Sequence, residues 1–110
     1  MPLSRELIAA SARPLLLSIL SRGESYGYAI IQEVSRLSAG RIEWTEGMLY
    51  PVLHRLEREG LIESRWDTSE PRKRKYYKLK REGRKALTEE REQWSVVQAA
   101  LTSLWEPKHV

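Results

Sequence analysis

The sequence contains no cysteine and only two histidines. The missing thiols exclude disulfides, thiolate metal sites, cysteine nucleophiles and iron–sulfur clusters. His54 falls in a predicted helix and His109 near the C-terminal end, so no paired-histidine metal site or histidine-based triad is visible. The glycines form no phosphate-binding loop, and the carboxylates are scattered among basic residues. We therefore expect no metal, no cofactor and no enzymatic activity.

Long hydrophobic runs are missing as well. The longest apolar stretch, Leu15–Leu20, contains Ser18 and is far shorter than the roughly 18 residues that a membrane-spanning helix needs. The N-terminal segment carries Glu6 where a secretory signal would be positively charged. Of the 110 residues, 41% are hydrophobic and 31% are charged. This composition predicts one compact, cytoplasmic unit with no membrane partner.

Positive charge is concentrated in one segment of the chain. Residues 70–85 contain nine basic and two acidic side chains, a local charge of +7, whereas the other ninety-four residues carry a net charge of −3. Clustered positive charge favours a polyanionic partner, because neutralising phosphates releases condensed counterions. Charge runs are often no more than a solvated face, so this cluster needs support from the surrounding fold.

Helical periodicity predicts a first and a second short helix before residue 41. The first covers about residues 4–21, and Pro14 inside it is expected to kink or divide the helix. The second has Ser25 as its candidate N-cap. Gly40 suits its exit, where a positive φ is often required.

A third helix is predicted between Thr45, a candidate N-cap, and Gly60. Pro51 removes one backbone hydrogen bond, so the first turn is expected to be irregular. The apolar residues of this helix recur at i, i+3, i+4 and i+7, which indicates one buried stripe; they are Leu49, Val52, Leu53 and Leu56.

The pattern changes after Gly60. Alternation with a period of two predicts a β-hairpin whose turn lies between Asp67 and Arg74 and whose second strand is basic. The last segment, Arg81–Trp105, is predicted to be a long helix. Its heptad positions are apolar except for one glutamate; they are Leu87, Glu90, Trp94, Val97, Leu101 and Leu104.

This order of elements predicts a mainly α (α+β) fold. Residues 1–80 are expected to form a winged helix-turn-helix DNA-binding domain with a two-stranded β-hairpin wing. Residues 81–110 are expected to form a long C-terminal dimerisation helix and a tail. In a winged helix-turn-helix the third helix enters a DNA groove and the hairpin flanks it.

The third helix and the hairpin carry the candidate DNA-binding residues. Arg55 supplies donors, Gly47 allows close approach, and the Tyr50 hydroxyl is expected to bind a phosphate. Arg58 is expected to be only solvated. Four adjacent cations of the hairpin would repel one another on a free loop, and strand alternation should place them on two sides, with Lys73 and Arg74 at the tip. The expected set is Thr45, Glu46, Gly47, Tyr50, Pro51, Arg55, Arg72, Lys73, Arg74 and Lys75.

Two runs resemble the PadR family of bacterial transcriptional regulators. They are TEGMLYPVLHRLEREGLI, from Thr45, and RKRKYYKLKREGR, from Arg72. The segment Tyr26-Gly27-Tyr28 is similar to the start of the family's second helix, which implies a phosphate contact for Tyr26. The resemblance covers about residues 7–105, departs mildly at Pro14 and Met48, and is closest to the subfamily with one C-terminal helix. It implies a homodimeric repressor that binds pseudo-palindromic operators and dimerises through this helix.

The terminal helix also predicts self-association from its own residues. At 1.5 Å per residue, a helix of this length spans about 37 Å, more than a small three-helix core needs. Its apolar side chains would form an exposed patch in a monomer, and the first helix offers a second apolar surface. A twofold dimer would match the symmetry of an operator. The expected dimerisation residues are Leu87, Trp94, Val97, Leu101 and Leu104.

Trp94 has two interpretations. A tryptophan at a heptad seam is usually part of the core. Near a twofold axis, however, Trp94 would face its symmetry mate, and two indoles could sandwich a flat aromatic ligand. Some members of the family that the chain resembles bind planar aromatic effectors between subunits. The expected effector-binding residues are Trp94, Glu90, Gln93 and Val97.

The sequence therefore predicts a sequence-specific DNA-binding transcriptional regulator, a homodimeric repressor released by a small planar aromatic effector at the dimer interface. Its expected partners are double-stranded operator DNA, a second copy of the chain and the aromatic ligand. The alternative is a winged-helix protein–protein interaction module, in which the +7 segment docks on an acidic protein face without specific DNA binding.

Overall fold

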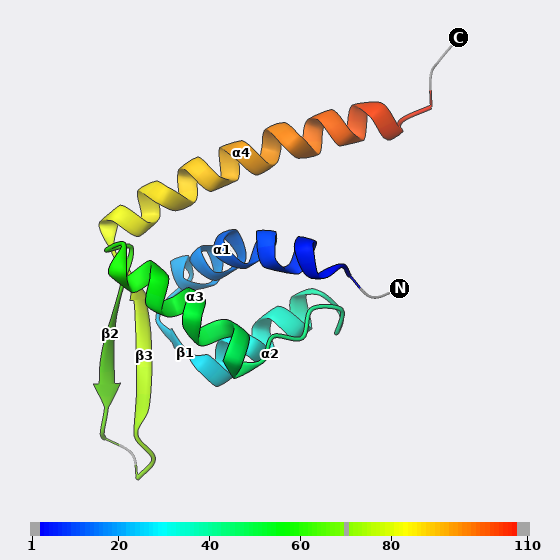
Figure 1. Cartoon of the computed structure of the whole chain (residues 1–110). Helices are drawn as coiled ribbons and strands as arrows, with labels where there is room; N and C mark the ends of the chain where they lie inside the picture. Colours follow the sequence, from blue (N-terminus) through cyan, green and yellow to red (C-terminus); the bar gives the residue numbers. More distant parts are fainter. Residues whose placement is uncertain (1–2, 70, 108–110) are drawn as a thin grey trace.

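The computed structural model describes residues 3–69 and 71–107. Four helices and a small antiparallel sheet follow one another in the predicted order (Figure 1). The elements are α1 (Arg5–Ser21), β1 (Ser25–Tyr26), α2 (Gly27–Leu37), α3 (Glu46–Arg58), β2 (Ile62–Asp67), β3 (Arg74–Leu79) and α4 (Arg81–Trp105). The winged helix-turn-helix with a long C-terminal helix is confirmed. His109 and the end of the predicted tail, residues 108–110, lie outside the described residues.

Helix α1 is continuous, so the prediction that Pro14 could divide it was wrong. Ser4 caps the helix by accepting a hydrogen bond from the Leu7 amide at 3.2 Å. The bond that Pro14 cannot make would have ended on the carbonyl of Ala10, an exposed residue whose carbonyl water can reach. The buried face of the helix holds both halves in the core; it comprises Ala12, Leu16, Leu17 and Leu20.

Helix α2 begins one residue later than predicted. Ser25 is not its N-cap, because Ser25 pairs with Tyr77 in strand β1. Tyr26 occupies the cap position and makes no side-chain capping bond. At the exit, Gly40 has the expected positive φ of 78°, and Ala39 before it is also left-handed, at 53°.

Helix α3 has the predicted caps. The Thr45 side chain accepts from the Met48 amide at 3.2 Å, and Gly60 leaves the helix with φ 76°. Pro51 lies inside a helix that is unbroken from Glu46, so the expected irregular turn is absent. Of the predicted stripe, Leu49, Leu53 and Leu56 are fully buried, whereas Val52 is only partly buried.

The hairpin is confirmed, and a short third strand joins it in the order β1-β3-β2. The ladder of β2 and β3 runs from Ile62 opposite Leu79 to Asp67 opposite Arg74. Trp66 lies opposite Lys75, on the same side of the sheet as Ile62. Strand β1 has only two residues, too few to show an alternating pattern.

Helix α4 extends beyond the rest of the chain (Figure 1). Its first part packs against α1 and buries Leu87, whereas every described residue from Arg91 onward is exposed. The radius of gyration is 16.2 Å, compared with about 13 Å for a compact domain of this length. Within the described ranges, no helix combines the length and hydropathy needed to cross a membrane.

Gly83 is the point where α4 crosses the end of the sheet. A Cβ atom there would collide with the Leu61 carbonyl oxygen and lie 2.5 Å from a methyl carbon of Leu79. We expect Gly83→Ala to lower the free energy of unfolding by about 2 kcal/mol, because backbone cannot yield to the added atom. The control is Gly47→Ala, whose Cβ meets no described atom closer than 3.8 Å; it should raise stability slightly. Urea unfolding curves measure both, and equal midpoints would contradict this packing.

Candidate nucleic-acid interface

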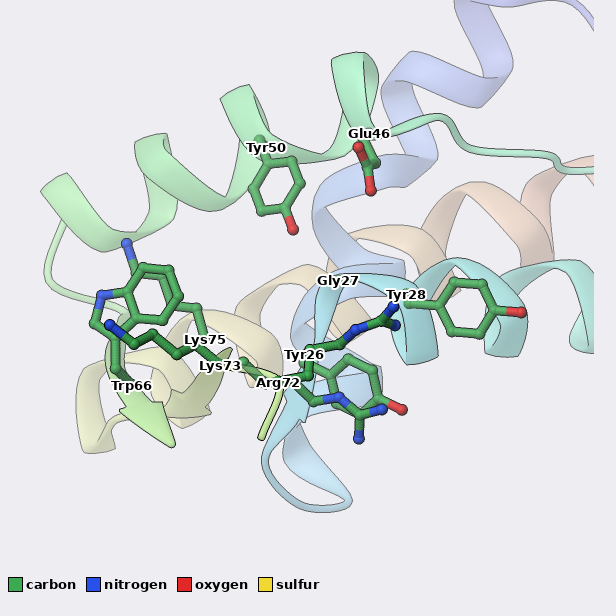
Figure 2. A pocket seen from close by; sticks show the side chains of 10 residues that line it. Tyr26, Gly27, Tyr28, Glu46, Tyr50, Trp66, Arg72, Lys73 and Lys75 are labelled. Atoms are coloured by element: carbon green, nitrogen blue, oxygen red, sulfur yellow. The ribbon is translucent and has the colours of Figure 1, made fainter. Parts of the chain in front are cut away.

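A groove of about 680 Å³ opens between α3, the start of α2 and the hairpin. Figure 2 shows Tyr50 reaching down from α3 while lysine and arginine side chains approach from the hairpin. Four cations at one groove create a positive potential that favours a polyanion. The lining residues are Tyr26, Gly27, Tyr28, Glu46, Tyr50, Trp66, Arg72, Lys73, Arg74 and Lys75.

The groove contains most of the predicted DNA-binding residues. Glu46 and Tyr50 come from α3, Tyr26 precedes α2, and all four hairpin cations contribute. The other predicted residues do not line the groove but are exposed along the same helix and its cap; these are Thr45, Gly47, Pro51 and Arg55. Helix α3 therefore presents an exposed face beside the cationic groove.

Three residues that line the groove were not predicted from the sequence. Gly27 and Tyr28 belong to a triplet that had been noted only for its resemblance. Trp66 is 62% exposed and lies at the outer end of the strand face that begins with buried Ile62. The period-two alternation from Ile62 was a signal that could have found Trp66, because it puts the ring opposite the basic strand.

Tyr50 and Gly27 fit together closely. A Cβ at Gly27 would lie 2.6 Å from the Tyr50 hydroxyl oxygen and 3.1 Å from its ring carbon Cζ. The hydroxyl therefore rests against the first residue of α2, whose N-cap Tyr26 leaves the end without a side-chain cap. Free amides and the positive end of the helix dipole favour an anion at such an end. A tyrosine donor and uncapped amides thus meet at one point of the groove.

Aromatic rings hold two of the hairpin cations in place. The Arg74 guanidinium lies 4.5 Å from the centre of the Tyr26 ring. The Lys75 ammonium lies 5.9 Å from the Trp66 ring and 5.7 Å from the Tyr77 ring. Such cation–π contacts restrict the cations without neutralising them. Arg74 and Lys75 lie on opposite sides of β3, as predicted, because Arg74 contacts Tyr26 and Lys75 contacts Trp66. Arg72 and Lys73 precede the strand, and all four cations line the groove.

Two carboxylates at the hairpin, those of Glu24 and Asp67, are engaged by nearby side chains. Arg65 binds Glu24 at 2.5 Å, and this hydrogen bond raises the pKa of Arg65. The Ser69 amide and hydroxyl both donate to Asp67, at 3.0 and 2.6 Å. These hydrogen bonds lower the pKa of Asp67. Asp67 therefore stays ionised and stabilises the turn that carries the hairpin cations.

Tyr77 is buried close to the groove, and no described residue accepts or donates a hydrogen bond to its hydroxyl. Burial raises the pKa of Tyr77 from 10.0 to about 12, and the charges of Tyr50 and Glu57 add to the shift. Because the pKa of Tyr77 is raised in the folded protein, its contribution to the free energy of unfolding is fully present below pH 10 and is lost as the pH rises through about 12.

Tyr77→Phe should therefore leave stability at neutral pH unchanged or about 1 kcal/mol higher, because it removes an unsatisfied buried group. It should also remove the part of the stability loss at alkaline pH that the ionisation of Tyr77 causes. Urea unfolding between about pH 8 and pH 12 measures both effects. If the free energy of unfolding fell equally with pH in the variant and the wild type, the raised pKa assigned to Tyr77 would be contradicted.

A second, smaller depression lies between α1 and α4. It has a volume of about 350 Å³ and contains Trp94 and Glu90, whereas Gln93 and Val97 do not line it. Glu90 is bound to Arg13 at 3.0 Å. Of the predicted dimerisation residues, Leu87 belongs to the hydrophobic core, and the others are exposed on α4: Trp94, Val97, Leu101 and Leu104. The described residues contain no cluster of three or more side chains that could hold a metal ion.

Comparisons with known proteins agree with this arrangement. The family model described as the transcriptional regulator PadR-like family matches residues 16–89. The transcriptional regulator Rv3488 of Mycobacterium tuberculosis is 39% identical over 87 residues, which are 79% of this chain and 78% of the relative. The transcriptional regulator YqjI of Escherichia coli is 34% identical over 86 residues, 78% of this chain but only 40% of that protein.

Solved structures show the same fold. A PadR family transcriptional regulator from Eggerthella lenta superposes with a TM-score of 0.80 at 35% identity, covering 94% of this chain and 88% of the other. A transcriptional regulator from Clostridium thermocellum gives a TM-score of 0.85 at 28% identity, covering 94% and 99%. The resemblance drawn from the sequence motifs is confirmed. The chain belongs to the PadR-like family, whose members are transcriptional regulators and not enzymes.

Proposed function

We propose that the protein is a homodimeric repressor that binds a pseudo-palindromic DNA operator, in the cytoplasm where such DNA is found. The observation that carries the proposal is the groove in which four hairpin cations, three tyrosines and the uncapped start of α2 converge beside the exposed face of α3. Such a surface suits DNA, because the cations and tyrosines can bind the phosphate backbone while helix α3 enters a groove of the duplex. Residues 1–80 would bind DNA, and residues 81–110 would join the two subunits.

Each part of the surface has a distinct role in this proposal. The α3 face reads base edges in the major groove, with Arg55 as the main donor and Gly47 allowing close approach; Thr45, Glu46 and Pro51 border this contact. Tyr50 and Tyr26 hold one phosphate at the start of α2. The hairpin cations bind the flanking backbone, which adds affinity but little specificity.

The dimer is proposed from the exposed half of α4. Trp94 and Leu101 are 37% and 38% exposed, and they follow Leu87 along one side of the helix at heptad spacing. Val97 and Leu104, at 52% and 80% exposure, continue this apolar side. An apolar strip of this length on a helix that leaves the body favours a partner helix. A second copy of the chain would bury this apolar strip against its own α4 in a twofold-symmetric contact.

The proposed effector is a small planar aromatic molecule bound near Trp94 at the dimer interface. A ligand there would change the angle between the two reading heads, provided that it binds one arrangement more tightly than the other. Glu90 already pairs with Arg13, so a polar group of the ligand would depend more on Gln93, with Val97 beside it. Indole fluorescence titrations of wild type and Trp94→Ala test this, and equal quenching in both would rule it out.

Selection from a random duplex library tests the proposed function. The full-length protein should enrich sequences that contain two inverted half-sites, about one helical turn apart from centre to centre. A single recurring half-site would support DNA reading without the dimer. Recovery of no common sequence would contradict specific binding and favour the alternative, in which the cationic groove docks on an acidic protein.

Gly27→Ala tests the role given to Tyr50. The new Cβ should displace the Tyr50 hydroxyl, which lies at the far end of a side chain that can move, so the fold should survive. Affinity should fall about tenfold for the selected duplex and for a scrambled one, as expected for a lost phosphate contact. In a Tyr50→Phe background the same substitution should have a smaller effect. Unchanged affinity of Gly27→Ala, measured by fluorescence anisotropy, would contradict the contact.

A further inference from the structure

Arg13, in the middle of α1, joins three helices through one guanidinium group. Its Nη1 atom donates to Glu59 Oε2 at 2.7 Å, and its Nε atom lies 3.0 Å from Glu90 Oε1. Glu59 is the residue that ends α3, and Glu90 lies on α4. The Arg13 and Glu59 side chains are 37% and 41% exposed, and that of Glu90 is 18% exposed.

The two glutamates lie at the ends of two functional segments: Glu59 at the end of α3, and Glu90 where α4 leaves the body of the protein. The Glu59 amide donates to the Arg55 carbonyl at 3.0 Å, so Glu59 belongs to the turn that carries the proposed base-reading arginine. Glu90 is the last partly buried residue of α4, because every described residue after it is exposed. Arg13 therefore ties the end of the reading helix to the point where the proposed dimer helix leaves the body.

The ion pairs of Arg13 are suited to fixing the relative orientation of the helices rather than to raising the stability of the fold. Partly exposed ion pairs contribute little to the free energy of unfolding, typically between about 0 and 1 kcal/mol. A guanidinium is a rigid planar fork, however, and it fixes the relative direction of the groups that it binds. With one carboxylate on Nη1 and the other on Nε, the two helix positions are held at a set angle.

We propose that Arg13 is a positioning residue that fixes the reading helix relative to the dimer helix and thereby sets the half-site spacing that the dimer accepts. The inference rests on the proposed function, since spacing has a meaning only for two reading heads joined by α4. In this arrangement Arg13 touches no DNA. It acts through Glu59 on α3 and through Glu90 on α4.

The test is a spacing series built on the duplex selected by the wild-type protein. One or two base pairs are inserted between the half-sites or deleted, each of which shifts a half-site by about 3.4 Å and rotates it by about 35°. Wild-type affinity should fall at least about twentyfold at the first changed spacing, and Arg13→Gln should reduce this penalty to less than about fivefold. Glu90→Gln, which removes only the ion pair between Arg13 and α4, should reduce the spacing penalty in the same way. The double variant should be no flatter than either single one.

Arg36→Gln is the matched control. It removes the same charge, but Arg36 pairs at 2.6 Å with Glu33 inside α2 and bridges no other described helix. This variant should keep the wild-type spacing penalty. Urea midpoints and sedimentation velocity should show Arg13→Gln folded and dimeric; if it is unfolded, Glu90→Gln decides the question.

A steep spacing penalty in folded Arg13→Gln and Glu90→Gln would overturn the inference and leave the proposed function intact. A wild-type protein that shows no preference for the selected duplex would overturn both. A penalty lost equally in Arg36→Gln would also overturn it, because net charge would then explain the effect.

Discussion

Replacing Tyr50 and Arg55 together with alanine should lower the preference for the selected duplex by up to about 100-fold while leaving the dimer intact. Arg55 is exposed on α3 and available to base edges, and the Tyr50 hydroxyl sits at the start of α2. Loss of a good base contact costs about 1–3 kcal/mol, and a lost phosphate contact adds to it. Affinity for the selected duplex should fall by about 30-fold to 1,000-fold, whereas affinity for a scrambled duplex should fall by about tenfold, the loss expected from the phosphate contact alone.

Arg58→Ala is the control for this double variant. It removes an exposed cation from the same helix, at a position that we expect to be only solvated. Anisotropy titrations should show a preference close to that of the wild type. If the double variant kept its preference, or if Arg58→Ala lost it, α3 would not read the operator in the orientation proposed here.

Replacing Leu101 with glutamate should convert the dimer to a monomer. A charge at the centre of the proposed α4 interface would be buried without a partner, which strongly disfavours association. Linked half-site binding exceeds single-site binding by about 10²- to 10⁴-fold. Operator affinity should therefore fall at least about a hundredfold at a fixed protein concentration.

Val96→Glu provides the matched control, because Val96 is 65% exposed and lies on the opposite side of α4 from Leu101. Sedimentation velocity should find this variant dimeric, and its operator affinity should match that of the wild type. A dimeric Leu101→Glu protein would show that α4 does not join the subunits through this side, and dissociation of Val96→Glu would place the interface elsewhere.

Local signals in the sequence predicted most of the fold. Thr45 and Gly60 bound α3 because capping and positive-φ geometry are decided within one turn of helix. Predictions that depended on distant contacts did less well. Ser25 looks like a cap from its neighbours, but its pairing with Tyr77 in β3 places it in a strand. Pro14 looks like a break, but α1 is anchored in the core on both sides of it, by Ala12 before Pro14 and by Leu16 after it.

The candidate site follows the same division. Tyr50 and the hairpin cations could be predicted, because residue type and helix face identify them in sequence. Gly27 could not be predicted from its neighbours, because its role is to leave room for a tyrosine from another helix. The contacts of Arg13 likewise join residues from three helices, and no local pattern in the sequence pairs them.

The most direct test of the central claim is an anisotropy titration of the selected duplex beside a scrambled duplex, across a series of salt concentrations. Salt should weaken binding to both duplexes, because counterion release supports both. We expect a preference of at least about 10³-fold for the selected duplex that persists across the series. Equal and steeply salt-dependent binding to the two duplexes would contradict it, since the groove would then be only a basic surface.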